Sequence, residues 1–288
     1  LEGLYELGVR IFSDDGDSVA DTVLLARIMS RLADLPGAVL AQHAEDRAMT
    51  AGGQMHQGAV SERLGLSGLP AEAETSVVAR DLELVRKSGV KYHCQHISAG
   101  ATLGEVSRAK KEGFDVTAEV TPHHLVFTDL DVVSIGTNLK MYPPVRGNDD
   151  REALVTALKS GLIDIVATDH APHSSEEKAV SFADAPRGVI GLETAASAVW
   201  QTLGDPLRFF EVMSGAPARL AGFVDQGLPL QAGNTANLVV FDREEKWTVG
   251  EFRSRSANSP FTGTTMTGRV KTTIYQGKIT HGMSTANV

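Results

Sequence analysis

The chain has 288 residues, of which 42% are hydrophobic, and it carries a formal net charge of -9. This length suffices for one large domain, or for one domain with a smaller second unit. The acidic balance and the lack of a basic run argue against nucleic acid as the main partner, and no apolar run approaches the about 18 residues of a membrane span. The single cysteine, Cys94, excludes an internal disulfide framework and is typical of a reducing cytoplasm.

Five short apolar segments follow one another with the same ending. Each begins at or near a glycine and ends in Asp, His or Glu, and together they cover residues 8–15, 37–46, 89–98, 113–124 and 161–170. Helical patterns are found between and after them, at 18–35, 72–89, 150–161, near 190–204 and near 206–221. Alternation of strand and helix predicts a parallel α/β sheet, whose strands are covered on both faces and therefore read as near-continuous apolar runs.

The pattern changes after about residue 228. Segments such as "TANLVVFD" and "GRVKTTIYQGKITHG" are short, alternating and punctuated by turns, which predicts a small antiparallel β unit. We therefore expect a division into 1–227 and 228–288. The longest expected loops, 47–70 and 171–190, are long enough to favour a functional role.

Polar residues lie at the ends of four of the five predicted strands, namely Asp15, His43, His96 and Asp169. Carboxylate and imidazole are ligands for zinc, manganese or iron, and a barrel of parallel strands gathers catalytic residues at this end. One such residue alone is more often a hydrogen-bonded structural group, but four at equivalent positions favour a metal site. Next to Asp169, the strand alternation turns His170 to the other face, which indicates a structural role or a role in supporting a ligand residue.

Several motifs occur in a fixed order along the chain. They are "FSDDG", "QHAED", "QHIS", "EVTPHHL", "NLKMYPPVR", "ATDHAPH" and "GVIGLET". In this order they resemble the type I dihydroorotases of the amidohydrolase superfamily, over nearly the whole chain. The resemblance implies a cytoplasmic, zinc-dependent hydrolase with a (β/α)₈ TIM-type barrel. Its reaction would be the reversible hydrolysis of the cyclic amide of dihydroorotate to N-carbamoyl-aspartate, in pyrimidine biosynthesis.

The resemblance also implies a role for each strand-end residue. Asp15 would bridge two zinc ions, in place of the carboxylated lysine of other amidohydrolases. His43 and His96 would be the ligands of one ion. Asp169 would be a ligand of the other ion and the general acid and base of the reaction.

Substrate binding is implied for a second set of residues. His173 and the backbone at Arg187 and Gly188 match substrate-binding positions of the family. Tyr142 in "KMYPP" fills a position where the family often has Asn, and we retain it as a substrate-binding candidate.

The number of predicted strands and the number of predicted metal ligands are both smaller than the barrel and a second zinc ion require. Five predicted strands are three short of a barrel of eight, and Asp15 with Asp169 is a small ligand set for a second zinc ion. The family fills that set with a His-x-His pair at the end of its first strand, and the sequence has no such pair. We therefore expect the first three strands to lie upstream of Leu1, and residues 1–288 alone to be poorly soluble or inactive.

Other functions stay open from the sequence. Allantoinases and hydantoinases share the barrel, but their usual bridging lysine argues against them here. A mononuclear hydrolase would use His43, His96 and one carboxylate. A non-catalytic homologue would serve as a scaffold for aspartate carbamoyltransferase, which is also a candidate partner of the enzyme. A small-molecule substrate and a homo-oligomer are expected, with no role for nucleic acid or a membrane.

The remaining polar residues have plainer interpretations. His123 and His124 in "TPHHL" indicate a structural strand-to-loop turn. Glu45 and Asp46 are typical of acids at a helix N-terminus, where they favour the helix dipole. Cys94 is not expected to be a nucleophile, because no matching His–Asp relay is visible.

Overall fold

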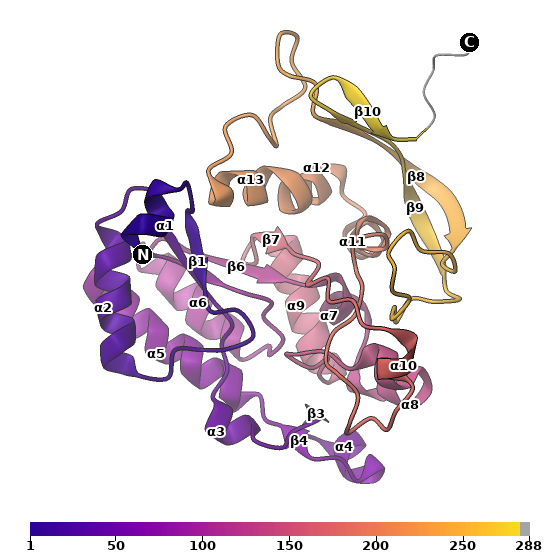
Figure 1. The fold of residues 1–288 in the computed structure, drawn as a ribbon, viewed down its shortest axis with the longest axis horizontal. Helices are drawn as coiled ribbons and strands as arrows, with labels where there is room; N and C mark the ends of the chain where they lie inside the picture. Colours follow the sequence, from indigo (N-terminus) through magenta and orange to yellow (C-terminus); the bar gives the residue numbers. More distant parts are fainter. Residues whose placement is uncertain (283–288) are drawn as a thin grey trace.

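The computed structural model describes residues 1–282. Its main sheet has five parallel strands in the order β1-β2-β5-β6-β7 (Figure 1). These strands are β1 (Ile11–Ser13), β2 (Val39–Gln42), β5 (Lys91–Cys94), β6 (Val116–Val120) and β7 (Ile165–Val166). Each of the five predicted apolar segments contains one of them, so the predicted parallel α/β sheet is confirmed.

The strand register brings the carboxyl ends of the strands to one edge of the sheet. Ser13 pairs with Ala41, Gln42 pairs with Cys94, and Val120 pairs with Val166. The residues that directly follow these strands therefore emerge at the same edge, which positions the candidate site.

Long helices connect the strands and cover the sheet. They are α2 (Thr22–Ala33), α5 (Glu72–Ser88), α6 (Thr102–Lys111) and α9 (Asn148–Ser160), with α2 packed on α5 and α5 on α6. Helix α2 begins where the Asp21 carboxylate accepts hydrogen bonds from two main-chain amides of its first turn. It buries Leu25, Met29 and Leu32, whose spacing of four and three residues forms one apolar stripe against the core.

A second group of helices follows the last parallel strand. Helix α11 spans Ala195–Leu203, and the predicted helix near 206–221 consists of α12 (Pro206–Phe210), the π-helical η3 (Glu211–Gly215) and α13 (Ala216–Ala221). Further short helices are α1 (Glu2–Glu6), α3 (Arg47–Thr50), α4 (Ala59–Leu64), α7 (Pro122–Val126), η1 (Asp129–Asp131), α8 (Val132–Ile135), η2 (Gly136–Leu139) and α10 (Ser175–Lys178). None of the helices within residues 1–282 is long and apolar enough to cross a membrane.

The expected loop at 47–70 contains regular structure. Besides α3 and α4 it includes β3 (Met55–His56) and β4 (Gly68–Leu69), which pair in parallel with each other. The sequence expectation was wrong here, because two-residue strands are too short to show a periodic pattern. The expected loop at 171–190 is irregular except for α10.

The C-terminal part forms a separate antiparallel sheet of three strands, in the order β10-β9-β8. These are β8 (Leu238–Thr248), β9 (Thr265–Tyr275) and β10 (Lys278–His281), drawn in orange to yellow in Figure 1. Helix α11 contacts this sheet, because Ser197 Oγ donates to the Gly268 carbonyl at 2.5 Å and Trp200 Nε1 donates to the Arg243 carbonyl at 3.0 Å. The division into 1–227 and 228–288 stays a prediction.

Candidate metal centre

Three of the four strand-end residues lie together. Asp15 follows β1, His43 follows β2 and His96 follows β5, and one ligand atom from each lies within 4.8 Å of the others. His43 Nδ1 is 3.0 Å from His96 Nε2, and Asp15 Oδ1 is 3.5 Å from the same His96 nitrogen. His43 and His96 are 3% and 5% exposed, whereas the Asp15 side chain is 57% exposed and reaches the solvent.

These donors fit a bound divalent cation. Two imidazole nitrogens and a carboxylate oxygen are the usual protein ligands of a catalytic zinc ion, which keeps one further position open. Two buried ring nitrogens 3.0 Å apart need a shared proton or a cation between them. The chemistry of the donor set and its convergence therefore favour a metal ion at this position.

The charges at this position shift one another's pKa values. A hydrogen bond to His96 lowers the pKa of the Asp15 carboxyl. Burial opposes protonation of His96, but the Asp15 carboxylate and the nearby Asp169 charge outweigh it and raise the pKa of the imidazole. Asp169 lies outside the group of three ligand atoms, and burial raises the pKa of its carboxyl.

Two of the strand-end residues adopt an uncommon backbone conformation. His96 has φ +28° and Asp169 has φ +44°, both positive values at non-glycine residues. Such conformations cost of order 1–3 kcal/mol and persist only where the surroundings hold them. At His96 the amide donates to Glu119 Oε1 at 3.2 Å, which helps to hold the bend that turns the ring toward His43.

Glu45 orients the His43 ring. His43 Nε2 lies 3.2 Å from Glu45 Oε2, so this nitrogen carries the proton and Nδ1 keeps its lone pair for a cation. Burial raises the pKa of Glu45, but hydrogen bonds from His43, Thr50 and Tyr142 lower it further than burial raises it. The expectation of a helix N-terminal acid is correct for Asp46, which caps α3. Glu45 directly precedes this cap and is not among the three grouped ligand residues, but its carboxylate also binds His43, Thr50 and the distant Tyr142, which the expectation did not include.

Glu119 on β6 is a functional candidate that the sequence reasoning missed. Its Oε2 accepts a hydrogen bond from His93 Nε2 at 3.0 Å, and its Oε1 accepts from the His96 amide. It therefore links β6 both to β5 and to the backbone of His96, one of the three grouped ligand residues. The only signal in the sequence was a carboxylate inside a short predicted strand, "VTAEV".

Tyr142 contacts both the metal centre and the 171–190 segment. Its hydroxyl donates to Glu45, and its ring stacks with the His43 ring at a centroid distance of 5.7 Å and an angle of 23°. The Arg187 guanidinium carbon lies 3.8 Å from the centroid of the same ring. Burial raises the pKa of Tyr142 to about 12, so the hydroxyl keeps its proton as a donor at neutral pH.

The other predicted substrate residues lie together in the 171–190 segment. His173 Nε2 lies 2.9 Å from the Arg187 carbonyl oxygen. Gly188 has φ +134°, and a Cβ there would lie 2.6 Å from Ala171 Cβ, so the backbone here requires glycine. His170 Nδ1 accepts from the Gly191 amide at 3.1 Å, which agrees with its predicted structural role.

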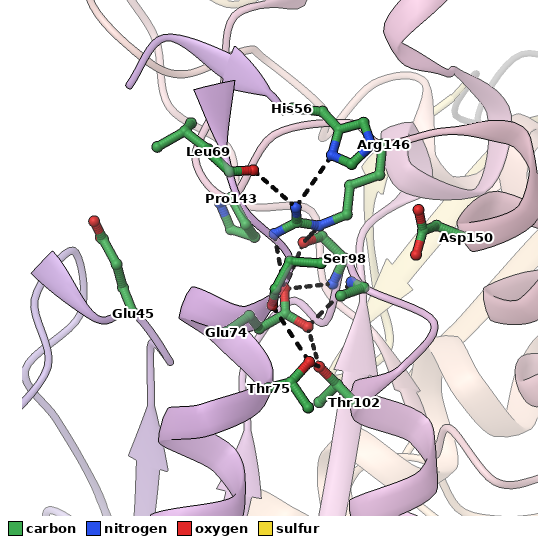
Figure 2. A network of polar contacts seen from close by, with 12 residues as sticks. Glu45, His56, Leu69, Glu74, Thr75, Ser98, Thr102, Pro143, Arg146 and Asp150 are labelled. Atoms are coloured by element: carbon green, nitrogen blue, oxygen red, sulfur yellow. Dashed lines mark hydrogen bonds and ion pairs between the residues drawn. The ribbon is translucent and has the colours of Figure 1, made fainter. Parts of the chain in front are cut away.

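A buried polar network supports the segment after His96 (Figure 2). The Glu74 carboxylate on α5 accepts from the Ser98 amide at 3.0 Å, the Ala99 amide at 3.1 Å and the Thr102 hydroxyl at 2.7 Å. The Arg146 guanidinium donates to Ser98 Oγ at 2.8 Å and to the Leu69 carbonyl at 3.2 Å. Figure 2 shows Arg146 reaching from one side and Glu74 from the other toward Ser98.

The remaining candidates have structural roles. His123 and His124 are buried in α7, so the predicted turn is a short helix that begins immediately after β6. His124 Nε2 donates to the Pro143 carbonyl at 3.0 Å and Nδ1 accepts from Thr121 Oγ1 at 2.7 Å, which defines one neutral tautomer. Cys94 is buried and burial raises the pKa of its thiol, in agreement with the expectation that it is not a nucleophile.

Comparisons with known proteins agree on one family. A family model described as Dihydro-orotase-like matches residues 1–101. The chain is 44% identical over 279 residues to a dihydroorotase of Mycobacterium tuberculosis, covering 94% of the chain and 65% of that protein. It is 42% identical over 288 residues to a dihydroorotase of Clostridium acetobutylicum, covering 98% of the chain and 67% of that protein. The chain thus spans about two thirds of the length of these relatives.

Solved structures with a similar fold include hydantoinases, which carry a different name from the dihydroorotases above. An L-hydantoinase (dihydropyrimidinase) from Arthrobacter aurescens superposes with a TM-score of 0.84 at 27% identity, covering 99% of the chain and 68% of that protein. A D-hydantoinase superposes with a TM-score of 0.80 at 20% identity, over 98% of the chain and 65% of that protein. The second likeness concerns the fold alone.

Proposed function

Because the chain belongs to the dihydroorotase family, we propose that its complete gene product is a dihydroorotase. The reaction would be the reversible hydrolysis of the cyclic amide of dihydroorotate to N-carbamoyl-aspartate, in pyrimidine biosynthesis. The observation that carries this proposal is the convergence of Asp15, His43 and His96 at the ends of three adjacent strands, in a chain that is 42% identical to a dihydroorotase.

The chain's residues would hold zinc through three named atoms, Asp15 Oδ1, His43 Nδ1 and His96 Nε2. A zinc ion bound there supplies Lewis acidity, which polarises the amide carbonyl and lowers the pKa of water. We further propose that Asp15 bridges to a second zinc ion that Asp169 also binds. The exposed Asp15 carboxylate has room on its second oxygen for such a bridge.

Asp169 is the proposed general acid and base. Burial raises the pKa of its carboxyl, and a carboxylate at this place could accept a proton from the attacking water and return it to the departing amide nitrogen. His173, Tyr142 and the backbone at Arg187 and Gly188 would bind and orient the substrate. His173 Nε2 and the Arg187 carbonyl oxygen already lie 2.9 Å apart, and Arg187 stacks on Tyr142.

The proposal includes the fold and partners of the complete protein. We propose that the five parallel strands are part of a (β/α)₈ barrel and that the C-terminal antiparallel sheet is the small β unit of the family. A homo-oligomer, a contact with aspartate carbamoyltransferase and a cytoplasmic location are further proposals. The cytoplasmic location is supported by the single, buried cysteine, because a reducing compartment does not favour disulfide bonds.

A substrate panel tests the reaction. The complete gene product should hydrolyse dihydroorotate in preference to allantoin and hydantoin, and should contain about two zinc ions per subunit. Turnover of allantoin or hydantoin without dihydroorotate would reject the proposal in favour of a related amidase. One zinc ion per subunit would indicate a mononuclear hydrolase. A protein that contains no zinc and turns over none of the substrates would indicate a non-catalytic scaffold.

A further inference from the structure

Two lysine side chains are buried beside the proposed substrate segment. Lys140 follows η2 and is 3% exposed, and Lys178 ends α10 and is 6% exposed. Buried ammonium groups are costly unless they are well partnered. Within residues 1–282, all the hydrogen bonds found for these two groups go to main-chain carbonyl oxygens. Burial, with Lys140 nearby, lowers the pKa of Lys178 to about 8.

Lys178 binds three carbonyl groups from two segments. Its Nζ donates to the Pro186 carbonyl at 2.8 Å, the Thr137 carbonyl at 3.0 Å and the Lys140 carbonyl at 3.3 Å. Three donors on one nitrogen match three acceptors that no single neutral side chain would satisfy. Lys178 therefore joins the 171–190 segment to the 137–140 segment.

Lys140 makes the converse connection. Its Nζ donates to the Phe182 carbonyl at 2.6 Å and the Ala183 carbonyl at 3.0 Å, and it lies 5.4 Å from the centroid of the Phe182 ring. Each lysine thus comes from one segment and binds carbonyl groups of the other. We call this pair of lysines, with their carbonyl partners, the lysine clamp.

The clamp fixes the backbone on both sides of Arg187. The Pro186 carbonyl accepts from Lys178, and the Gly188 amide donates to the Lys140 carbonyl at 2.8 Å. Arg187 is thereby held with its guanidinium against the Tyr142 ring and its carbonyl oxygen 2.9 Å from His173 Nε2. The segment that the lysines hold is the one that carries the proposed substrate contacts.

We propose that Lys140 and Lys178 are positioning residues that hold the 171–190 segment against Tyr142 and so set the affinity for substrate. Among the hydrogen bonds found within residues 1–282, neither ammonium group binds a proposed metal ligand, and the clamp acts through Arg187, Gly188 and His173. The kinetic part of this inference rests on the proposed function, whereas its structural part does not.

The test uses the complete gene product with Lys178→Met and Lys140→Met. Methionine has a side chain of similar length to lysine but lacks the ammonium donors. The matched control is Lys87→Met, at an exposed lysine on α5. Hydrogen exchange is followed in peptides from 171–190 and from α5, together with kcat, KM and zinc content. We expect exchange in 171–190 to accelerate about tenfold, with α5 unchanged. We also expect KM to rise about tenfold, equivalent to about 1.4 kcal/mol, with kcat within about threefold and zinc content unaltered.

Other outcomes overturn the inference. Equal acceleration in 171–190 and in α5 would show that the lysines only stabilise the fold, and an unchanged KM would show that they do not position the substrate segment. If Lys178→Met does not fold, Lys178→Gln, which keeps two donors, is judged by the same criteria. A wild-type protein that does not turn over dihydroorotate would reject the proposed function, and the exchange result would still decide on the clamp.

Discussion

Glu74 provides the sharpest test of how the molecule supports the segment after His96. Its buried carboxylate accepts four hydrogen bonds, two of them from Ser98, one from Ala99 and one from Thr102. In Glu74→Gln one of the two oxygens becomes an amide donor, so one main-chain amide, of Ser98 or of Ala99, loses its acceptor whichever way the amide turns. The hydroxyl on the same side keeps its bond only by accepting from the new amide instead of donating. The change also removes the charge that lies 3.8 Å from Arg146 Nη2, in a pair that is nearly fully buried.

The magnitude follows from these losses. Hydrogen bonds to a charged group contribute about 1.5–3 kcal/mol each, and breaking a buried ion pair by removing one partner costs about 3–5 kcal/mol. Because the two estimates describe the same contacts, they do not add. We therefore expect Glu74→Gln to lower the free energy of unfolding by about 3–5 kcal/mol. Ser98 is two residues after His96, so zinc affinity should fall as well.

Urea unfolding of the complete gene product measures the first effect, and competition with a chelator measures the second. Glu72→Gln is the matched control, since Glu72 is exposed in the first turn of the same helix. A change of less than about 0.5 kcal/mol is expected for the control. Our reasoning about the network would be refuted if Glu74→Gln lowered stability by no more than the control does.

Three further predictions concern substitutions of single residues. Tyr142→Phe removes the donor to Glu45 but keeps the ring, so chelator competition should show zinc affinity reduced by about tenfold; unchanged affinity would show that the Tyr142 hydroxyl is not needed to hold Glu45 against His43. Burial lowers the pKa of His124 to about 3, below its unfolded value of about 6.5. The unfolded chain therefore binds more protons, and stability is lost as pH falls from about 6.5 toward 3. In His124→Asn, the free energy of unfolding measured with urea should depend less steeply on pH in this range, by about 1.4 kcal/mol per pH unit. An unchanged slope would show that His124 is not the group that causes this loss of stability. Gly188→Ala places a Cβ 2.6 Å from Ala171 Cβ at φ +134°, so it should raise KM for dihydroorotate and cost about 1–3 kcal/mol in urea unfolding; wild-type values would show that the backbone adapts.

The parallel sheet was predictable because its signal is local. Each strand is a continuous apolar run that ends in a polar residue, and the parallel arrangement then places those ends at one edge. Asp15, His43 and His96 converge as this rule requires. Within the described residues, Asp169 does not join their ligand atoms. The strand pattern could not predict this, because it does not show how the chain turns after β7.

The supporting residues were not predictable from local patterns. Glu45 reads as a helix N-terminal acid until Tyr142, 97 residues away, is seen to donate to it. Glu74 and Arg146 carry no local signal that distinguishes them from other charged residues of a helix and a loop, and both are buried against Ser98. Their roles depend on partners that only the tertiary structure brings together.

Zinc binding by the metal-stripped gene product, measured together with dihydroorotate turnover, tests the central claim most directly. The wild type should be inactive without metal and should recover turnover as zinc is added. His96→Asn, which removes an imidazole ligand at the centre of the group of three, should lower zinc affinity by about a hundredfold and abolish turnover. If His96→Asn bound zinc and hydrolysed dihydroorotate like the wild type, Asp15, His43 and His96 would not be the metal centre on which the reaction depends.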